Sequence, residues 1–154
     1  MKGDTKVIEL LNAILTNELT AINQYFAHAK MCQHWGYTAL GGKLRAESID
    51  EMRHAEQLMD RILFLDGVPN LQRLGKVKVG ETVPEQFAVD HALELEAVGF
   101  LNECIKVCYD ADDNGSLELV KSILVSEEEH IDWIEEQQNL IENIGLQNYL
   151  ASQV

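Results

Sequence analysis

SIDEMRHA at residues 48–55 and SEEEHIDW at residues 126–133 each contain the pattern Glu-x-x-His. Residues three apart on an α-helix share a face, so Glu51 and His54 of the first stretch present a carboxylate and an imidazole to one point. Two such pairs, projecting inward from different helices, are typical ligands of a pair of redox metal ions in a helical bundle. The two stretches therefore predict a helical bundle with a candidate metal centre inside it.

The second pair, Glu127 and His130, is part of a longer internal register. A shift of 76 residues superimposes the first pair on the second and also places Glu18 on Glu94. Four carboxylates and two imidazoles therefore recur in the two halves of the chain. The same shift also aligns one pair of glutamates far from the predicted centre, so agreement in register does not by itself prove a site.

Apolar residues recur at helical spacing along most of the chain and predict four long helices. The glycines and the proline after the second helix are typical of a long connection. The sequence DADDNG is a turn by composition. The predicted helices cover about residues 5–34, 37–65, 82–109 and 116–143, the connection covers 66–82, and residues 146–154 form a short fifth helix or a docked tail.

The predicted turns bring the two lone glutamates level with the two Glu-x-x-His pairs. Glu18 lies 33 residues before Glu51, and the midpoint falls at residues 34–35, where the first turn is predicted. The spacing of 33 residues recurs between Glu94 and its Glu-x-x-His partner, with the midpoint at the edge of DADDNG. At about 1.5 Å per residue, each set lies roughly 25 Å from its turn. All six side chains are therefore expected at one level of the bundle.

Apolar neighbours predict that these carboxylates are buried. Ile49 and Met52 flank Glu51 in the sequence, and Glu18 lies among apolar residues at helical spacing. A buried carboxylate needs a cation or another partner to offset its desolvation. A mixed set of carboxylate and imidazole ligands favours iron or manganese over zinc.

The composition limits the partners of the chain. Its formal net charge of −14 argues against binding to nucleic acid and to anionic membrane surfaces. We expect a single domain over residues 1–154. Because the first residues lack the apolar core of a signal peptide, a cytoplasmic location is expected. Cys32, Cys104 and Cys108 form no Cys-x-x-Cys motif, which favours buried, reduced thiols over a zinc knuckle.

The sequence resembles bacterioferritin, the haem-containing branch of the ferritins, nearly from end to end. The resemblance implies an all-α, ferritin-like four-helix bundle with one long crossover and a short fifth helix at the C-terminus. The matching stretches are MKGDTKVI (1–8), NELTAINQYF (17–26), ESIDEMRHA (47–55), RILFLDGVPNLQ (61–72), SEEEHIDW (126–133) and GLQNYL (145–150).

The resemblance also implies a function. Bacterioferritins form a hollow shell of 24 subunits that oxidises Fe(II) with dioxygen or hydrogen peroxide and stores the product as a ferric mineral. The implied ferroxidase is a di-iron centre within each subunit, in which each iron has its own glutamate and histidine and two further glutamates bridge the irons. Carried over to this chain, Glu18 with His54 and Glu94 with His130 hold one iron each, and Glu51 and Glu127 are the bridges.

Two further residues acquire roles from the resemblance. Tyr25 matches a tyrosine near the centre that donates one electron, although a core tyrosine with a hydrogen-bonded hydroxyl explains it equally well. Met52 matches the methionine that, with its two-fold mate, ligates one haem b between two subunits, whereas the residues alone indicate a core methionine. On a helix Met52 projects about 100° away from its neighbour Glu51. A small ferredoxin is the implied electron donor, and the implied haem pocket is lined by Leu19, Ile22, Asn23 and Phe26.

The chain departs from the family pattern on the expected inner surface. Ala46 stands where some members carry an iron-binding histidine. Glu47 and Asp50 remain, which leaves a weaker inner site.

Two other functions stay open on the sequence alone. The chain could be one subunit type of a mixed bacterioferritin shell. It could also be a ferritin-like di-iron oxidase or peroxidase, although those enzymes usually add a substrate channel, an extra domain or a cysteine knuckle.

Overall fold

The computed structural model covers residues 1–154 and contains five helices and no strands. Four long helices and a short fifth one confirm the predicted all-α architecture, and the boundaries of the long helices lie within two residues of the predicted ones. None of the helices is both long enough and apolar enough to cross a membrane. The helices are α1 (Thr5–His34), α2 (Thr38–Phe64), α3 (Val83–Asp110), α4 (Asn114–Ile144) and α5 (Leu146–Ala151).

Side-chain caps set the starts of α1 and α3. The Asp4 carboxylate accepts a hydrogen bond from the Val7 amide at 3.1 Å, and the Thr82 hydroxyl accepts one from the Glu85 amide at 3.3 Å. Each cap satisfies one of the amides that have no partner in the first turn of a helix. The Glu85 carboxylate in turn accepts a hydrogen bond from the Glu81 amide at 2.8 Å. This reciprocal pair resembles a capping box, except that the returning bond comes from the residue before the cap.

α4 begins two residues earlier than predicted because Asp113 caps it. The Asp113 carboxylate accepts hydrogen bonds from the Ser116 amide at 3.0 Å and from the Ser116 hydroxyl at 2.7 Å. It also pairs with Arg61 of α2 at 2.7 Å. Asp112, just before the cap, takes φ 53° in the left-handed region. The predicted turn DADDNG therefore contains both a turn and the start of the helix.

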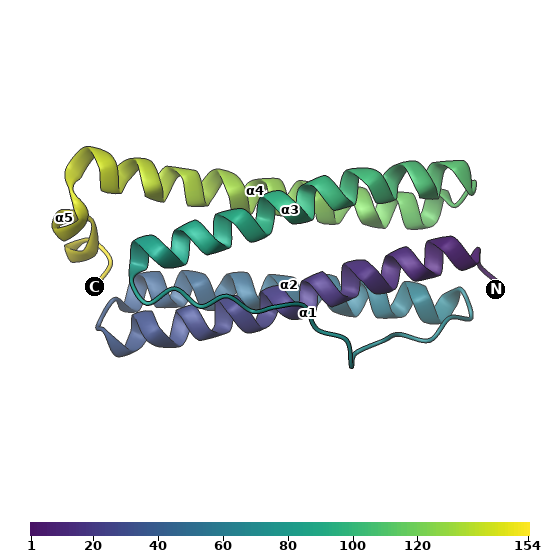
Figure 1. Ribbon diagram of the computed structural model, residues 1–154, viewed down its shortest axis with the longest axis horizontal. Coiled ribbons are helices and arrows are strands. Elements are labelled where there is room, and N and C mark those ends of the chain that lie inside the picture. The colour runs from purple at the N-terminus through teal and green to yellow at the C-terminus, as the bar shows by residue number, and fades with distance from the viewer.

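The four long helices form a bundle of two antiparallel hairpins, α1 with α2 and α3 with α4 (Figure 1). Gly36, with φ 91°, lies in the turn after α1, and Gly145, with φ 85°, ends α4. Glycine adopts this left-handed conformation without steric cost. α5 folds across the end of the bundle that is far from the N-terminus (Figure 1). Its Tyr149 is fully buried and donates a hydrogen bond to Gln137 of α4 at 2.9 Å.

The crossover between α2 and α3 lies along α1 (Figure 1) and is held there by a polar stripe. Its backbone amides have no helical partners and need other acceptors. Side chains of α1 at multiples of four residues supply them, because residues so spaced share one face of the helix. Asn12 accepts from the amide of Asn70, Thr20 from Gly75, Gln24 from Lys78 and His28 from Gly80, at 2.8, 2.9, 3.1 and 3.0 Å.

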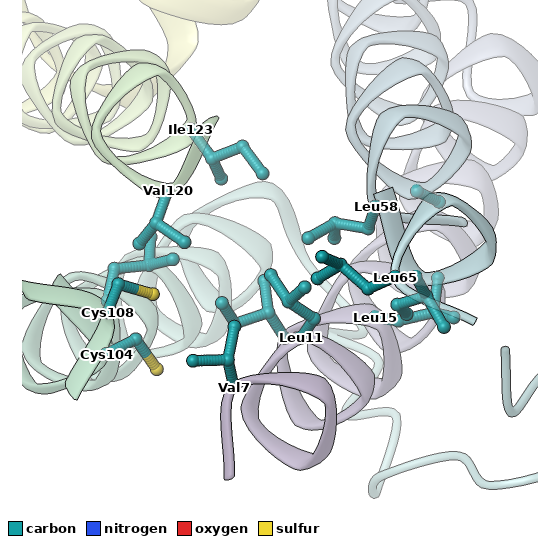
Figure 2. Close-up of a cluster of buried hydrophobic side chains, with 13 residues drawn as sticks. Val7, Leu11, Leu15, Leu58, Leu65, Cys104, Cys108, Val120 and Ile123 are labelled. Atoms are coloured by element: carbon teal, nitrogen blue, oxygen red, sulfur yellow. The ribbon is translucent and has the colours of Figure 1, made fainter. Parts of the chain in front are cut away.

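Two apolar clusters fill the bundle on either side of a polar layer. The first has 13 buried residues from all four long helices, among them Leu11, Leu58, Cys104 and Val120 (Figure 2). The second has 10 buried residues and joins the four long helices to Tyr149 of α5. On every long helix the predicted metal ligands fall between residues of the first cluster and residues of the second. The fold therefore places these ligands in the interior of the bundle, between its two cores.

All three cysteines are free and buried, as predicted. Burial raises the pKa of the Cys104 thiol to about 12 and that of Cys108 to about 11. Both therefore stay neutral near pH 7 and pack as small apolar side chains. Figure 2 shows their sulfur atoms within the first apolar cluster.

Candidate metal centre

The polar layer brings the six predicted ligands together. α1 contributes Glu18 and α3 contributes Glu94, while α2 and α4 each contribute a Glu-x-x-His pair on a single inward-facing turn. None of the six residues is more than 9 % exposed. Each half of the sequence repeat thus contributes one lone glutamate and one Glu-x-x-His pair to the same layer of the bundle.

The first half of the layer gathers around His54. Its Nδ1 atom lies 3.2 Å from Glu127 Oε1, 3.5 Å from Glu18 Oε2 and 3.8 Å from Glu51 Oε2. The ligand atoms of these four residues all lie within 4.8 Å of one another. Four donors at this spacing can surround one cation.

The second half gathers around His130. Its Nδ1 atom lies 3.0 Å from Glu51 Oε1, 3.6 Å from Glu94 Oε1 and 3.9 Å from Glu127 Oε1. These four residues again offer ligand atoms within 4.8 Å of one another. Glu51 and Glu127 belong to both sets, whereas Glu18 belongs only to the first. The layer can therefore hold two neighbouring cations that share two carboxylates.

Many polar atoms of the layer are buried without a hydrogen-bond partner. They include both carboxylate oxygens of Glu51 and the Nδ1 atoms of His54 and His130. Buried polar atoms are normally hydrogen-bonded, so a cluster of unpaired ones requires an explanation. Oxygen and imidazole donors that converge on two points fit two cations of the iron class.

Burial opposes simultaneous ionisation of these carboxylates. It raises the pKa of Glu18 and of Glu94 well above their ordinary range, and neighbouring carboxylates raise both pKa values further. Burial also raises the pKa of Glu127. The pKa of Glu51 is lowered, because its contacts with Glu18 and the two histidines outweigh its burial. Cations in the layer would relieve the repulsion among these groups.

The imidazoles carry compensating positive charge. Burial alone lowers the pKa of His54, but the close carboxylates of Glu127, Glu18 and Glu51 outweigh it and raise the pKa to about 12. The pKa of His130 is raised against burial in the same way, with Glu47 as the largest favourable cause. Protons therefore balance the charge of the layer, and bound cations would displace them.

The burial of Glu51 has a different cause from the one that its sequence neighbours suggested. Ile49 and Met52 are 39 % and 55 % exposed, whereas Glu51 is fully buried. The expectation that these neighbours bury the carboxylate is wrong, because consecutive residues point to different faces of a helix. The other three long helices enclose Glu51.

Tyr25 lies next to the second half of the layer. The fully buried side chain donates a hydrogen bond from its hydroxyl to Glu94 Oε1 at 2.7 Å. Its ring meets the His130 ring edge-on, with 6.3 Å between the ring centroids. Burial and the charge of Glu94 raise the pKa of the phenol well above its ordinary value, so the hydroxyl keeps its proton near pH 7.

Glu47 makes a contact with the layer that the sequence did not predict. We expected Glu47 and Asp50 at a weak inner-surface site; their ligand atoms do lie within 4.8 Å of one another and of a ligand atom of His130, and Glu47 is only 2 % exposed. One carboxylate oxygen contacts Nε2 of His130, and the other pairs with Lys43 at 2.8 Å. The sequence did contain a signal for this contact. Glu47 lies four residues before Glu51 and therefore shares its inward face of α2.

Two hollows reach the layer from opposite sides of the bundle. One of about 400 Å³ between α1 and α3 borders Glu18 and Glu94, with Asn17 and Glu96 also in its wall. The other, of about 310 Å³, lies between α2 and α4, is entirely polar and borders His54. Both hollows therefore border ligands of the layer.

A third hollow, of about 250 Å³, surrounds Met52 on the outer face of α1 and α2. Its wall includes Ile22, Asn23 and Phe26, three of the four residues that the resemblance implied. Leu19 lies outside this wall and packs against the first apolar cluster instead. Met52 points away from the metal layer, as its position beside Glu51 predicted.

Comparisons with known proteins agree with this geometry. The profile of the ferritin-like domain matches residues 8–144. The bacterioferritin of Streptomyces coelicolor is 53 % identical over 152 residues, which cover 99 % of this chain and 91 % of that protein. Those of Mycobacterium bovis and Rhodobacter capsulatus are 50 % and 42 % identical, over 98 % and 97 % of this chain and 95 % and 92 % of theirs. The chain therefore belongs to the ferritin-like proteins and, among them, to the bacterioferritins.

Proposed function

We propose that the protein stores iron and that each subunit is a ferroxidase, which oxidises Fe(II) to Fe(III) at the polar layer. The observation that carries the proposal is the pair of overlapping four-ligand sets that share Glu51 and Glu127. Dioxygen and hydrogen peroxide accept electrons in pairs, and each Fe(II) gives one. Two adjacent irons therefore suit the reaction better than one.

The ligand roles follow from the two sets. Glu51 and Glu127 would be shared by the two irons, because only they belong to both sets. The remaining ligands would hold one iron each, namely Glu18 with His54 and Glu94 with His130.

The α1–α3 hollow is the proposed entrance for Fe(II). Its wall includes Asn17 and the carboxylate of Glu96 outside the ligand set, and an acidic wall concentrates cations. Arriving Fe(II) displaces the protons held by the imidazoles and by the carboxylates of raised pKa. The ferric product leaves for the interior of a 24-subunit shell, where it is stored as mineral.

Anaerobic loading with Fe(II) followed by air tests the proposal. In His130→Ala, the fast oxidation phase should slow by at least about tenfold, since even the outer partners of metal ligands affect metal sites that strongly. Glu9→Ala is the matched control, because Glu9 is an exposed glutamate of α1 and should leave the fast phase unchanged.

Two results would contradict this function. An unchanged fast phase in His130→Ala would exclude the proposed centre. Rapid turnover with no mineral retained at a high ratio of iron to protein would instead favour the di-iron oxidase or peroxidase.

We also propose that Met52 ligates a haem b shared by two copies of the chain. The support is a methionine that is 55 % exposed in a hollow with the apolar walls Ile22 and Phe26. Arg45 lies in the same wall, with its guanidinium 5.9 Å from the Phe26 ring centroid, and offers a cation to a haem carboxylate. The haem would bring electrons from a small ferredoxin for release of the mineral.

A further inference from the structure

The two halves of the metal layer differ outside their ligand sets. His130 faces the ligands through Nδ1 and contacts Glu47 through Nε2. His54 has no such second partner, since all its carboxylate contacts are made through Nδ1. Its outer side borders the polar hollow between α2 and α4. The His130 imidazole therefore contacts carboxylates through both ring nitrogens, whereas the His54 imidazole does so through Nδ1 alone.

Glu47 is itself held firmly. Its Oε1 pairs with Lys43 Nζ at 2.8 Å. The Lys43 ammonium also lies 5.1 Å from the Trp133 ring centroid, where the electron-rich face of the indole attracts a cation. Trp133 in turn meets the Phe87 ring edge-on at 5.8 Å. A chain of contacts thus runs from the second apolar cluster through Lys43 and Glu47 to His130.

A carboxylate on the far nitrogen of a metal-binding histidine fixes the ring orientation and its tautomer, and it makes the ligating nitrogen more basic. We propose that Glu47, held by Lys43, is a positioning residue for His130 and makes the His130 half of the centre the tighter cation site. This inference rests on the proposed function of the layer. It implies that the first cation binds beside Glu94 and that the His54 half exchanges its cation more readily.

Glu47 could instead be a ligand of a third cation, bound between Glu47, Asp50 and His130. Ligand atoms of Glu47, Asp50 and His130 lie within 4.8 Å of one another. However, the Glu47 carboxylate already faces the Lys43 ammonium and the His130 imidazole, and Asp50 pairs with Arg53 at 2.7 Å. A further cation there would meet positive side chains on two sides, so the contacts favour positioning over ligation.

Cobalt(II) titration of the iron-free protein, followed by calorimetry and by visible absorption of the bound ion, tests the inference. The wild type should bind two cobalt ions per subunit in two steps. Glu94→Ala and Glu18→Ala identify which step belongs to which half. In Glu47→Gln the tighter step should weaken by about 10- to 100-fold, and the weaker step should stay within about twofold.

Lys43 provides a second variant that disturbs the core less, because its side chain is 44 % exposed. Lys43→Met keeps the stem over Trp133 but removes the charge, and it should weaken the same step by a smaller factor. Lys43→Arg restores a cation and should restore the affinity. Lys6→Met is the control, since Lys6 is an exposed lysine near the start of α1, and it should change neither step.

Several outcomes would overturn the inference. Equal weakening of both steps would make Glu47 a general structural residue, and loss of a third equivalent would make it a ligand. If the wild type binds two ions and both Glu47→Gln and Lys43→Met titrate in the same way as the wild type, the positioning role alone is rejected. A wild type that binds no cobalt would reject the proposed function and this inference together.

Discussion

Adjacent residues in this protein have opposite environments because a helix turns each side chain to a new direction. Glu51 is fully buried in the metal layer, and Met52 beside it is 55 % exposed on the outer face. Glu47 and Glu51 are four residues apart and share the inner face, but they contact different nitrogens of His130. The role of each residue follows from which atom of a neighbour it faces.

Tyr25 is the residue whose two interpretations an experiment can separate. Tyr25→Phe keeps the ring but removes the hydrogen bond to Glu94 Oε1, which should cost about 1 kcal/mol of stability. If Tyr25 donates an electron during iron oxidation, rapid-freeze electron paramagnetic resonance should show a tyrosyl radical in the wild type and none in the variant. Equal radical signals in both proteins would assign Tyr25 to packing alone.

At the scale of elements, the position of the crossover is set by hydrogen bonds to α1 rather than by bonds within the crossover. Its amides bond to a stripe of α1 side chains, and the stripe ends in a buried pair. His28 accepts from the Gly80 amide through Nε2 at 3.0 Å, so its proton lies on Nδ1, which donates to Asp90 of α3 at 3.1 Å. This tautomer is assigned from the hydrogen-bond network. One side chain thereby connects α1, the crossover and α3.

Removal of His28 should destabilise the bundle. His28→Leu leaves the Asp90 carboxylate buried with only the Gln24 amide, which donates at 2.8 Å. The loss should be about 3 kcal/mol, the usual cost of leaving a buried charged group without its partner. Thermal unfolding at one protein concentration measures it. The double variant His28→Leu, Asp90→Leu should recover part of the stability, and additive losses would show that the pair is not coupled.

The cap of α4 should make stability depend on pH in the acid range. Burial tends to raise the pKa of Asp113, but hydrogen bonds from Ser116 and Arg61 outweigh it and hold the pKa below its ordinary value of 3.8. A carboxylate with a lowered pKa stabilises the fold above the pKa of the unfolded chain, and it loses this effect as it takes up a proton below that value.

Asp113→Ala should therefore be less stable than the wild type by about 1–2 kcal/mol at pH 7. The difference should shrink as the pH falls below about 3.8, because the unfolded chain takes up a proton there before the folded carboxylate does. Thermal unfolding between pH 7 and pH 3 measures both effects. Asp110→Ala, at the exposed last residue of α3 just before this turn, should show neither. A constant difference at all pH values would exclude the charged cap as its source.

At the scale of the whole molecule, a single chain leaves apolar side chains exposed on the outer face of α1 and α2. Phe26, Ile49 and Met52 are 47 %, 39 % and 55 % exposed, and all three line the same hollow. A cluster of exposed apolar side chains of this kind marks a binding or assembly surface. The proposed haem between two copies would cover it.

Met52→Leu tests that assembly without touching the metal layer. The variant keeps an apolar side chain of similar size but removes the thioether, so we expect loss of haem and of the low-spin visible spectrum that two thioether ligands produce. Size-exclusion chromatography should still show a shell, since no bundle contact is lost. Met59→Leu, at a methionine that packs against the first apolar cluster, is the matched control and should keep the haem. Full haem content in Met52→Leu would assign the ligand elsewhere.

The sequence alone determined the helices, their order and the six residues at one level, because helical periodicity, caps and turn positions are local properties. Distances along the chain then place Glu18 and Glu94 opposite the Glu-x-x-His pairs. The resemblance to bacterioferritin supplied Met52, which periodicity alone assigned to the core.

The tertiary structure decided what depends on contacts between helices. It revealed the burial of Glu47 against His130, the stripe of α1 that holds the crossover, and the enclosure of Glu51 by other helices rather than by Ile49 and Met52. These contacts join residues that are far apart in the chain, and their partners depend on how helices rotate and pack. Local pattern fixed which residues face inward, whereas packing fixed which atoms meet there.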